Sequence, residues 1–162
     1  MTRPSPSKDR PPMPTLRAVP IKAPFVDWIL AGKKTWEIRS RSTNIRGRIG
    51  LIKSRSGTVV GSCEIADVVG PLTTALARKH GRSKMNESAA DAEGCEGLYA
   101  WVLADVRAFA TPVPYKHPYG AITWVTLDEP TAAKVLAATK RSKAVTGAAT
   151  PSRTRAPASR PA

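Results

Sequence analysis

Hydrophobic and polar residues alternate in short segments along the chain, which predicts a fold of several strands and a few helices. Alternation with a period of two buries one face of a strand and leaves the other face polar. Trp36 and Ile38 fall on one face of the segment 35–40. Glu37 and Arg39 fall on its other face. The strands predicted in this way cover residues 16–21, 35–40, 49–52, 58–69, 98–109 and 121–127.

Three other segments repeat their apolar residues at the spacing of an amphipathic helix. The first runs for about ten residues from Pro24, which suits a first helical turn, to Gly32, which suits the position just after a helix. The second covers residues 71–80, and the third follows Asp128, whose carboxylate can cap it. The residues expected to face inward are Leu72, Ala75 and Leu76 in the second helix and Ala132, Val135 and Leu136 in the third.

The segments between these elements are interpreted as turns and connections. Residues 44–47 and 54–57 have the composition of turns. The polar run 81–97 is interpreted as a mobile connection, and the proline-rich stretch 111–120 as a loop. Gly61, inside a long β-branched strand, indicates a bulge or a bend.

Short strands with two or three flanking helices predict an α+β fold, a small mixed β-barrel whose sheet is closed or nearly closed. The length of 162 residues fits one domain. We place this domain at residues 16–137, because the segments 1–15 and 138–162 consist largely of Pro, Ser, Thr, Ala and Arg. Segments of that composition cannot bury enough apolar surface to order themselves, so both are predicted to be disordered tails.

The charge indicates an anionic partner. The formal net charge of +14 comprises +2 from residues 1–15, +6 from residues 138–162 and +6 from the predicted domain. Within the domain, residues 22–55 contain nine lysines and arginines and two acids. This distribution predicts a surface that attracts phosphate groups, and the alternative interpretation is a solubilising face.

Other classes of protein have little support in the sequence. An apolar secretion signal and an uninterrupted apolar run of about 18 residues are both missing, so we expect a cytoplasmic protein that does not bind membranes. Cys63, Cys95, His80 and His117 lack the paired spacing of metal ligands, so we expect no metal site and no cofactor. We expect the protein to be a monomer.

One motif resembles a known family. Gly32 and Lys34 follow the first predicted helix as Gly-x-Lys, and Glu37 and Arg39 follow as x-x-Glu-x-Arg. This order resembles the signature of the ASCH domain family, whose fold is similar to that of PUA domains. The resemblance covers roughly residues 16–127, and further similar segments are 46–49, 99–103 and 120–124.

The resemblance implies a ligand-binding cleft and assigns residues to it. In this interpretation Lys34, Glu37 and Arg39 recognise a base or a sugar, with Lys34 as an exposed cation whose loss would leave the melting temperature nearly unchanged. The alternative is that Glu37 and Arg39 form a structural ion pair. The residues expected to contact RNA phosphates are Lys22, Arg46, Arg48, Lys53 and Arg55, together with the C-terminal tail.

Aromatic and loop residues supply further candidates. Trp28 interrupts the apolar stripe of the first helix and can stack on a base or pack on the barrel. Lys116, His117 and Tyr119 belong to a loop that can edge the cleft, with His117 as a candidate acid or base, or can be a plain surface loop. The remaining tryptophans, Trp36, Trp101 and Trp124, are expected in the core.

The family is implicated in RNA binding, in coactivator-associated roles and, in some members, in hydrolysis of RNA or of an acylated nucleoside. We therefore predict an RNA- or nucleoside-binding protein, with a hydrolase and a protein-interaction adaptor as the alternatives. Members resembling the acylated-cytidine amidohydrolase carry a Thr where this chain has Glu37, which argues against that activity. Thr35 is the nearest hydroxyl, two residues away.

Overall fold

The computed structural model describes residues 15–86 and 89–145, so most of both predicted tails lies outside the described residues. In the described part, one sheet contains β1 (Arg17–Ile21), β2 (Trp36–Arg39), β3 (Gly47–Lys53), β4 (Thr58–Val69), β5 (Tyr99–Pro114) and β6 (Val125–Thr126). The helices are α1 (Phe25–Leu30), α2 (Thr74–His80) and α3 (Glu129–Arg141), with a π-helical turn η1 (Gly81–Met85) and a 3-10 helix η2 (Ala89–Cys95).

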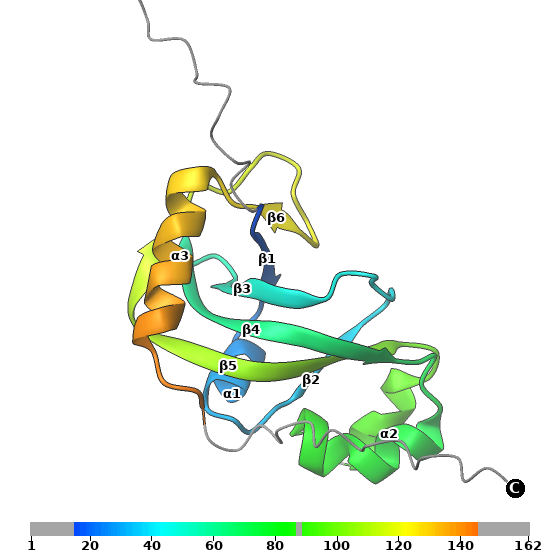
Figure 1. Ribbon diagram of the computed structural model, residues 1–162. Coiled ribbons are helices and arrows are strands. Elements are labelled where there is room, and N and C mark those ends of the chain that lie inside the picture. Colours follow the sequence, from blue (N-terminus) through cyan, green and yellow to red (C-terminus); the bar gives the residue numbers. More distant parts are fainter. Residues whose placement is uncertain (1–14, 87–88, 146–162) are drawn as a thin grey trace, which may run out of the picture.

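The sheet is mixed and curls into a half-barrel (Figure 1). Its strand order is β2-β5-β4-β3-β1-β6, with β1 parallel to β3 and every other neighbouring pair antiparallel. The predicted α+β fold with a small mixed β-barrel is therefore confirmed, with β2 and β6 as the edges of an incompletely closed sheet. None of the helices in the described residues is long and apolar enough to cross a membrane.

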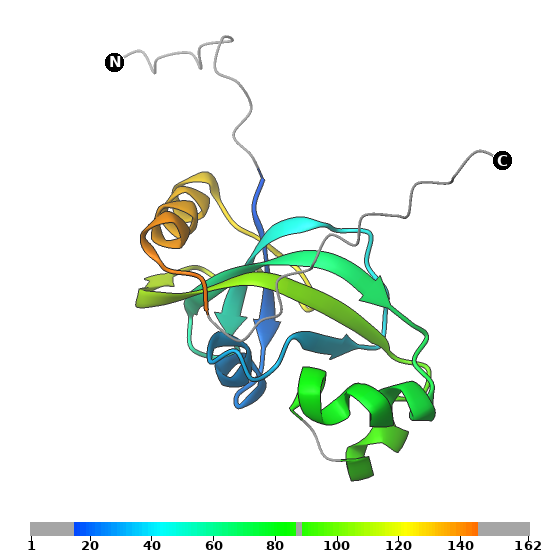
Figure 2. The ribbon, with the colours of Figure 1, turned by 60° about the horizontal axis from the view of Figure 1, so that its bottom comes forward.

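Each helix covers its own part of the apolar core, and Figure 2 shows α1 under the curled sheet between α3 and the α2 segment. Val26 and Ile29 of α1 are buried against the concave side of the sheet, where Trp101 lies at 1% exposure. Ala132 and Val135 of α3 are buried as predicted, against a cluster that includes Phe109. Apolar burial of this kind is the main favourable term in folding.

A third cluster lies under α2 on the outer side of β2. Trp36 packs there with Leu72 and Ala77. Ala75 was expected to face inward but is exposed, because α2 begins only at Thr74 and turns Ala77 toward the sheet instead. The Thr73 hydroxyl accepts a hydrogen bond from the Leu76 backbone N–H, which fixes this start.

Two glycines mark positions that other residues would fit poorly. Gly32 lies two residues after the last residue of α1 and has a φ of 77°. This left-handed conformation favours glycine, as the position after the helix predicts. Gly61 lies at a register shift between β4 and β5, and a Cβ there would come within 2.5 Å of the Arg107 carbonyl oxygen. This register shift agrees with the bulge or bend predicted at Gly61.

Several predicted boundaries were wrong, in each case because pairing or packing between distant segments sets the end. The helix α1 has six residues rather than about ten. Strand β5 continues to Pro114, into the predicted loop 111–120, because Val113 and Pro114 pair with the start of β4. Strand β6 is only two residues long, because it pairs with β1 at Arg17 and Ala18 alone.

The two segments expected to lack structure contain some. The predicted mobile connection 81–97 holds η1 and η2, and Met85 of η1 is buried in the cluster under α2. At the C-terminal end, the predicted boundary at residue 137 falls inside α3. Ala138 is buried, and the Val145 backbone N–H donates to the Val106 carbonyl at 2.8 Å.

Candidate functional site

A pocket of about 380 Å³ opens between the beginning of α1 and strand β2. Elements far apart in sequence meet here, because β2 pairs with β5 while α1 fills the concave side of the sheet. The pocket brings three of the predicted site residues together, Lys22, Glu37 and Arg39. Its lining is completed by Pro20, Ile21, Phe25, Ile38, Ser54 and Ile122.

Glu37 and Arg39 form an ion pair in this pocket. They leave the same face of β2, and Arg39 Nε lies 3.2 Å from Glu37 Oε1. The Arg39 guanidinium also donates a hydrogen bond to the Pro20 carbonyl at 2.8 Å and lies 5.6 Å from the centre of the Trp101 ring. The guanidinium is thereby held from several sides, so the pair presents a fixed acceptor and a fixed donor to the pocket.

Lys34 is buried, which overturns the expectation that it is an exposed cation. Its exposure is 2%, and its Nζ lies 5.5 Å from the centre of the Phe25 ring. Both the Lys33 and the Lys34 backbone N–H groups donate to the Trp28 carbonyl, so the turn after α1 directs Lys34 inward. Lys34 therefore contributes to the packing of the domain, whatever it contributes to binding.

A second pocket, of about 450 Å³, adjoins the first across Phe25 and Ile38, which line both. Trp28 lines this second pocket and is half-buried, with its ring packed edge-on against Phe25 at 5.5 Å between centroids. The remaining lining residues are Asn86, Asp91, Gly94, Cys95 and Leu98.

Arg48, one of the predicted phosphate contacts, is occupied by internal partners. Its guanidinium binds the Asp105 carboxylate, donates to the Asp105 carbonyl at 2.9 Å and lies 3.5 Å from Glu64. Burial alone would raise the pKa of Asp105, but the hydrogen bonds and charges of Arg48 and Arg107 outweigh it and lower that pKa. Arg48 therefore links β3 to β4 and β5, and its charge is engaged by these acids rather than by a phosphate.

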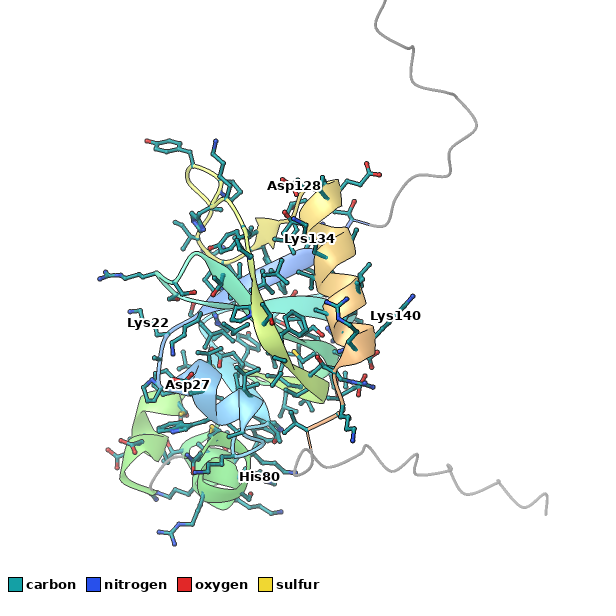
Figure 3. The ribbon with its side chains drawn as sticks, turned by 90° about the vertical axis from the view of Figure 1, so that its left-hand side faces the viewer. Lys22, Asp27, His80, Asp128, Lys134 and Lys140 are labelled. Carbon is teal, nitrogen blue, oxygen red and sulfur yellow. The ribbon has the colours of Figure 1, made fainter. Side chains whose placement is uncertain are left out.

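The other predicted phosphate contacts have different surroundings. Lys53 Nζ lies 3.2 Å from Asp27 Oδ1, which ties β3 to α1, and Figure 3 shows Lys22 and Asp27 on the same side of the molecule. Arg46 lies 4.0 Å from Asp67 and donates to the carbonyls of Thr43 and Ile45. Arg55 is exposed in the turn between β3 and β4.

The predicted cleft loop 111–120 contributes no residue to the two pockets near α1, and the segment after it, which was predicted as a strand, contributes Ile122. Both ring nitrogens of His117 are engaged, by the Tyr115 hydroxyl at 3.0 Å and the Ala121 carbonyl at 2.9 Å. Lys116 and Tyr119 are exposed and do not line either pocket near α1. Ile122, which the sequence did not single out, lines the first pocket at 84% exposure.

Among the described residues that line the two pockets near α1, Ser54 of the first pocket is the only one with a hydroxyl side chain, and Thr35, the hydroxyl nearest the motif, is not among them. The Thr35 hydroxyl is buried, and within the described part of the chain it has no hydrogen-bond partner. Among the described residues, no group of three or more His, Cys, Asp or Glu side chains gathers as a metal site would require.

The structure exposes a second basic segment that the sequence reasoning missed. Lys79 and Arg82 are exposed and Lys84 is half-buried, within a run of residues 78–84 that contains no acid. Burial and the charges of Lys79 and Lys84 lower the pKa of His80, whose ring packs at 4.9 Å from that of Trp36. The acid-free run was the available signal, but residues 78–80 were interpreted as the end of a helix and residues 81–84 as part of a polar connection.

Comparisons with known proteins agree with this architecture. A family model described as the ASCH domain matches residues 19–113, more than half of the chain. The crystal structure of the ASCH protein from Zymomonas mobilis matches with a TM-score of 0.58 and 21% identity, over 75% of this chain and 93% of that one. Two single-residue variants of that protein match with the same TM-score and identity, over 75% of this chain and 96% and 94% of theirs. A comparison with curated proteins gave no match.

Proposed function

The chain belongs to the ASCH domain family, and on that premise we propose that its first pocket binds a nucleoside or a nucleotide unit of RNA. The observation that carries this proposal is the fixed pair of Glu37 and Arg39 inside a pocket of about 380 Å³. Concave sites of roughly 300–1,000 Å³ with a few placed polar groups are typical of small-ligand binding.

The chemistry of the pocket fits the parts of a nucleotide. Glu37 can accept hydrogen bonds from a base amino group or a ribose hydroxyl, while Arg39 can donate to a carbonyl or a phosphate. Phe25 offers an aromatic wall, and Lys22 is an exposed cation on the lining that can contact a phosphate. Ile122 adds an exposed apolar side chain from the loop after β5.

The test is direct binding of the four ribonucleosides, their monophosphates and short single-stranded RNAs, measured by calorimetry with wild type and Glu37→Gln. The variant keeps the shape of the side chain and removes its charge, so the affinity should fall by roughly ten- to a hundredfold, the value of a charge-assisted hydrogen bond. Glu64→Gln is the matched control, because Glu64 is an exposed glutamate on β4 outside the pocket.

Equal affinities for wild type and Glu37→Gln would show that the ligand does not occupy this pocket. Absence of binding by every probe would refute the proposal altogether. The hydrolase alternative has its own readout, namely product formation from the same RNAs and nucleosides with metal ions chelated. Neither the buried Thr35 hydroxyl nor the engaged His117 ring favours it, so we expect retention of ligand without products.

A further inference from the structure

Four cations occupy the turn after α1 and the segment where α2 continues into η1: Lys33, Lys79, Arg82 and Lys84, here called the η1 patch. None of these four forms an ion pair within the described residues, and only Lys84 is partly buried. By contrast, the neighbouring Arg78 is paired with Glu93 at 3.3 Å. Cations without acidic partners are the ones whose charge remains available to a ligand.

The η1 patch is anchored to the same elements that line the pockets. The Lys84 carbonyl accepts a hydrogen bond from the Thr35 backbone N–H at 2.8 Å, which ties η1 to the residue just before β2. Lys33 is tied to the end of α1, because its N–H donates to the Trp28 carbonyl at 2.9 Å. Burial of Met85 fixes η1 on the core. The patch therefore has a set position relative to Glu37 and Trp28.

The two pockets connect Glu37 to this patch. They adjoin across Phe25 and Ile38, and the second pocket is lined by Trp28 and by Asn86, the residue that follows η1. A strand of nucleic acid needs aromatic surfaces for successive bases and cations beside its backbone. Phe25 and Trp28 supply aromatic surfaces in the pockets, and the η1 patch supplies cations on the segment that leads into Asn86 of the second pocket.

We infer that the ligand is a single-stranded RNA segment rather than an isolated nucleoside, with bases in the two pockets and a backbone phosphate on the η1 patch. This inference rests on the proposed function, because it extends the same pocket. The lowered pKa of His80 agrees with it, because after burial its causes are the charges of Lys79 and Lys84, which therefore act on the same ring. Arg46, Arg48 and Lys53 contribute less, since each of them already faces an acid.

The test compares two double variants that remove the same charge from different places. Lys79→Ser/Arg82→Ser changes the η1 patch. Lys134→Ser/Lys140→Ser removes two exposed lysines of α3, which Figure 3 shows on the opposite side of the molecule from Asp27. Affinities are measured for a monophosphate nucleotide and for single-stranded RNAs of two, four and eight nucleotides, each over a range of salt concentrations.

We expect RNA to bind more tightly than the mononucleotide. Lys79→Ser/Arg82→Ser should reduce this difference in affinity about tenfold, and Lys134→Ser/Lys140→Ser should change it little. The negative slope of log affinity against log salt should become shallower by about 1.4 for Lys79→Ser/Arg82→Ser, which is the value for two phosphate contacts on a single strand. The mononucleotide affinity should be the same in both variants, because neither alters the first pocket.

Three outcomes would overturn the inference. Equal losses in the two double variants would reduce the effect to diffuse attraction. RNA that binds no better than a mononucleotide would confine the ligand to the first pocket, and the proposed function would stand if Glu37→Gln still weakened binding. RNA binding that responds to the η1 variant but not to Glu37→Gln would refute the proposed pocket function, and the path through both pockets with it.

Discussion

The ammonium of Lys34 lies 5.5 Å from the centre of the Phe25 ring, in a side chain that is only 2% exposed. A cation over an aromatic face is stabilised by the ring quadrupole, and more strongly when water is excluded. Lys34 thus packs against a residue that the two pockets share, because Phe25 lines both of them. The motif position expected to be an exposed recognition group is part of the packed interior.

We predict that Lys34→Ala destabilises the domain, contrary to the expectation for an exposed cation. Truncating a long buried side chain leaves a cavity, so the free energy of unfolding should fall by about 2 kcal/mol or more. Lys34→Met should recover much of this loss, because it restores the volume without the charge. Urea unfolding of both variants measures the effect, and Lys33→Ala, at an exposed position, should change stability by less than about 0.5 kcal/mol. Unchanged stability in Lys34→Ala would contradict the buried placement.

Arg39→Lys is predicted to weaken both stability and ligand binding although it preserves the charge. A lysine cannot reproduce the planar fork that contacts Glu37 and the Pro20 carbonyl and lies over the Trp101 ring. The expected loss of stability is about 1–3 kcal/mol, with ligand affinity reduced by roughly tenfold.

The control for this substitution is Arg41→Lys, since Arg41 is an exposed arginine just beyond β2. Urea unfolding and calorimetric titration with the RNAs described above measure the two effects. Equal changes in stability and affinity for Arg39→Lys and Arg41→Lys would show that the planar guanidinium of Arg39 contributes to neither.

Features with local causes could be predicted from the sequence. Asp128 caps α3 through the Thr131 N–H at 2.9 Å, and Gly32 follows α1, because both signals act within one helical turn. The alternation in β2 likewise put Glu37 and Arg39 on one face, where they form the ion pair given as the structural alternative. Whether they also bind a ligand is a question that the ion pair does not decide.

Features that depend on distant partners could not be predicted. Arg48 and Lys53 were interpreted as phosphate contacts from local charge alone, but Asp105 lies 57 residues from Arg48 and Asp27 lies 26 residues from Lys53. Charge along a sequence cannot reveal such pairing. The η1 patch was missed for the opposite reason, since packing of Met85 orders a segment whose polarity suggested a mobile connection.

The Arg48–Asp105–Arg107 network predicts a pH dependence. Hydrogen bonds and charges from the two arginines outweigh burial and lower the pKa of Asp105 below its ordinary value of 3.8 in the folded protein. A lowered folded-state pKa stabilises the fold above the ordinary value, and this contribution is lost as the pH falls through the folded-state pKa. Unfolding free energies of wild type and Asp105→Asn should therefore differ most near neutral pH and converge as the pH falls below the lowered folded-state pKa of Asp105. A constant difference across this range would exclude Asp105 as the titrating group.

Gly61→Ala is predicted to disrupt the bulge that lets β4 and β5 curl around α1. A Cβ at this position would come within 2.5 Å of the Arg107 carbonyl oxygen and 2.6 Å of Leu30 Cδ2, so backbone and helix would both have to shift. Overpacking of this kind costs about 1–3 kcal/mol. Gly94→Ala is the matched control, because a Cβ there meets nothing within 4 Å and the unfolded chain loses some freedom. Thermal unfolding should show a clear decrease in Tm for Gly61→Ala and an unchanged or slightly higher Tm for Gly94→Ala. Because Gly61 lies where β4 closely approaches β5 and α1, an undisturbed Tm in Gly61→Ala would mean that the two strands do not approach as closely as described.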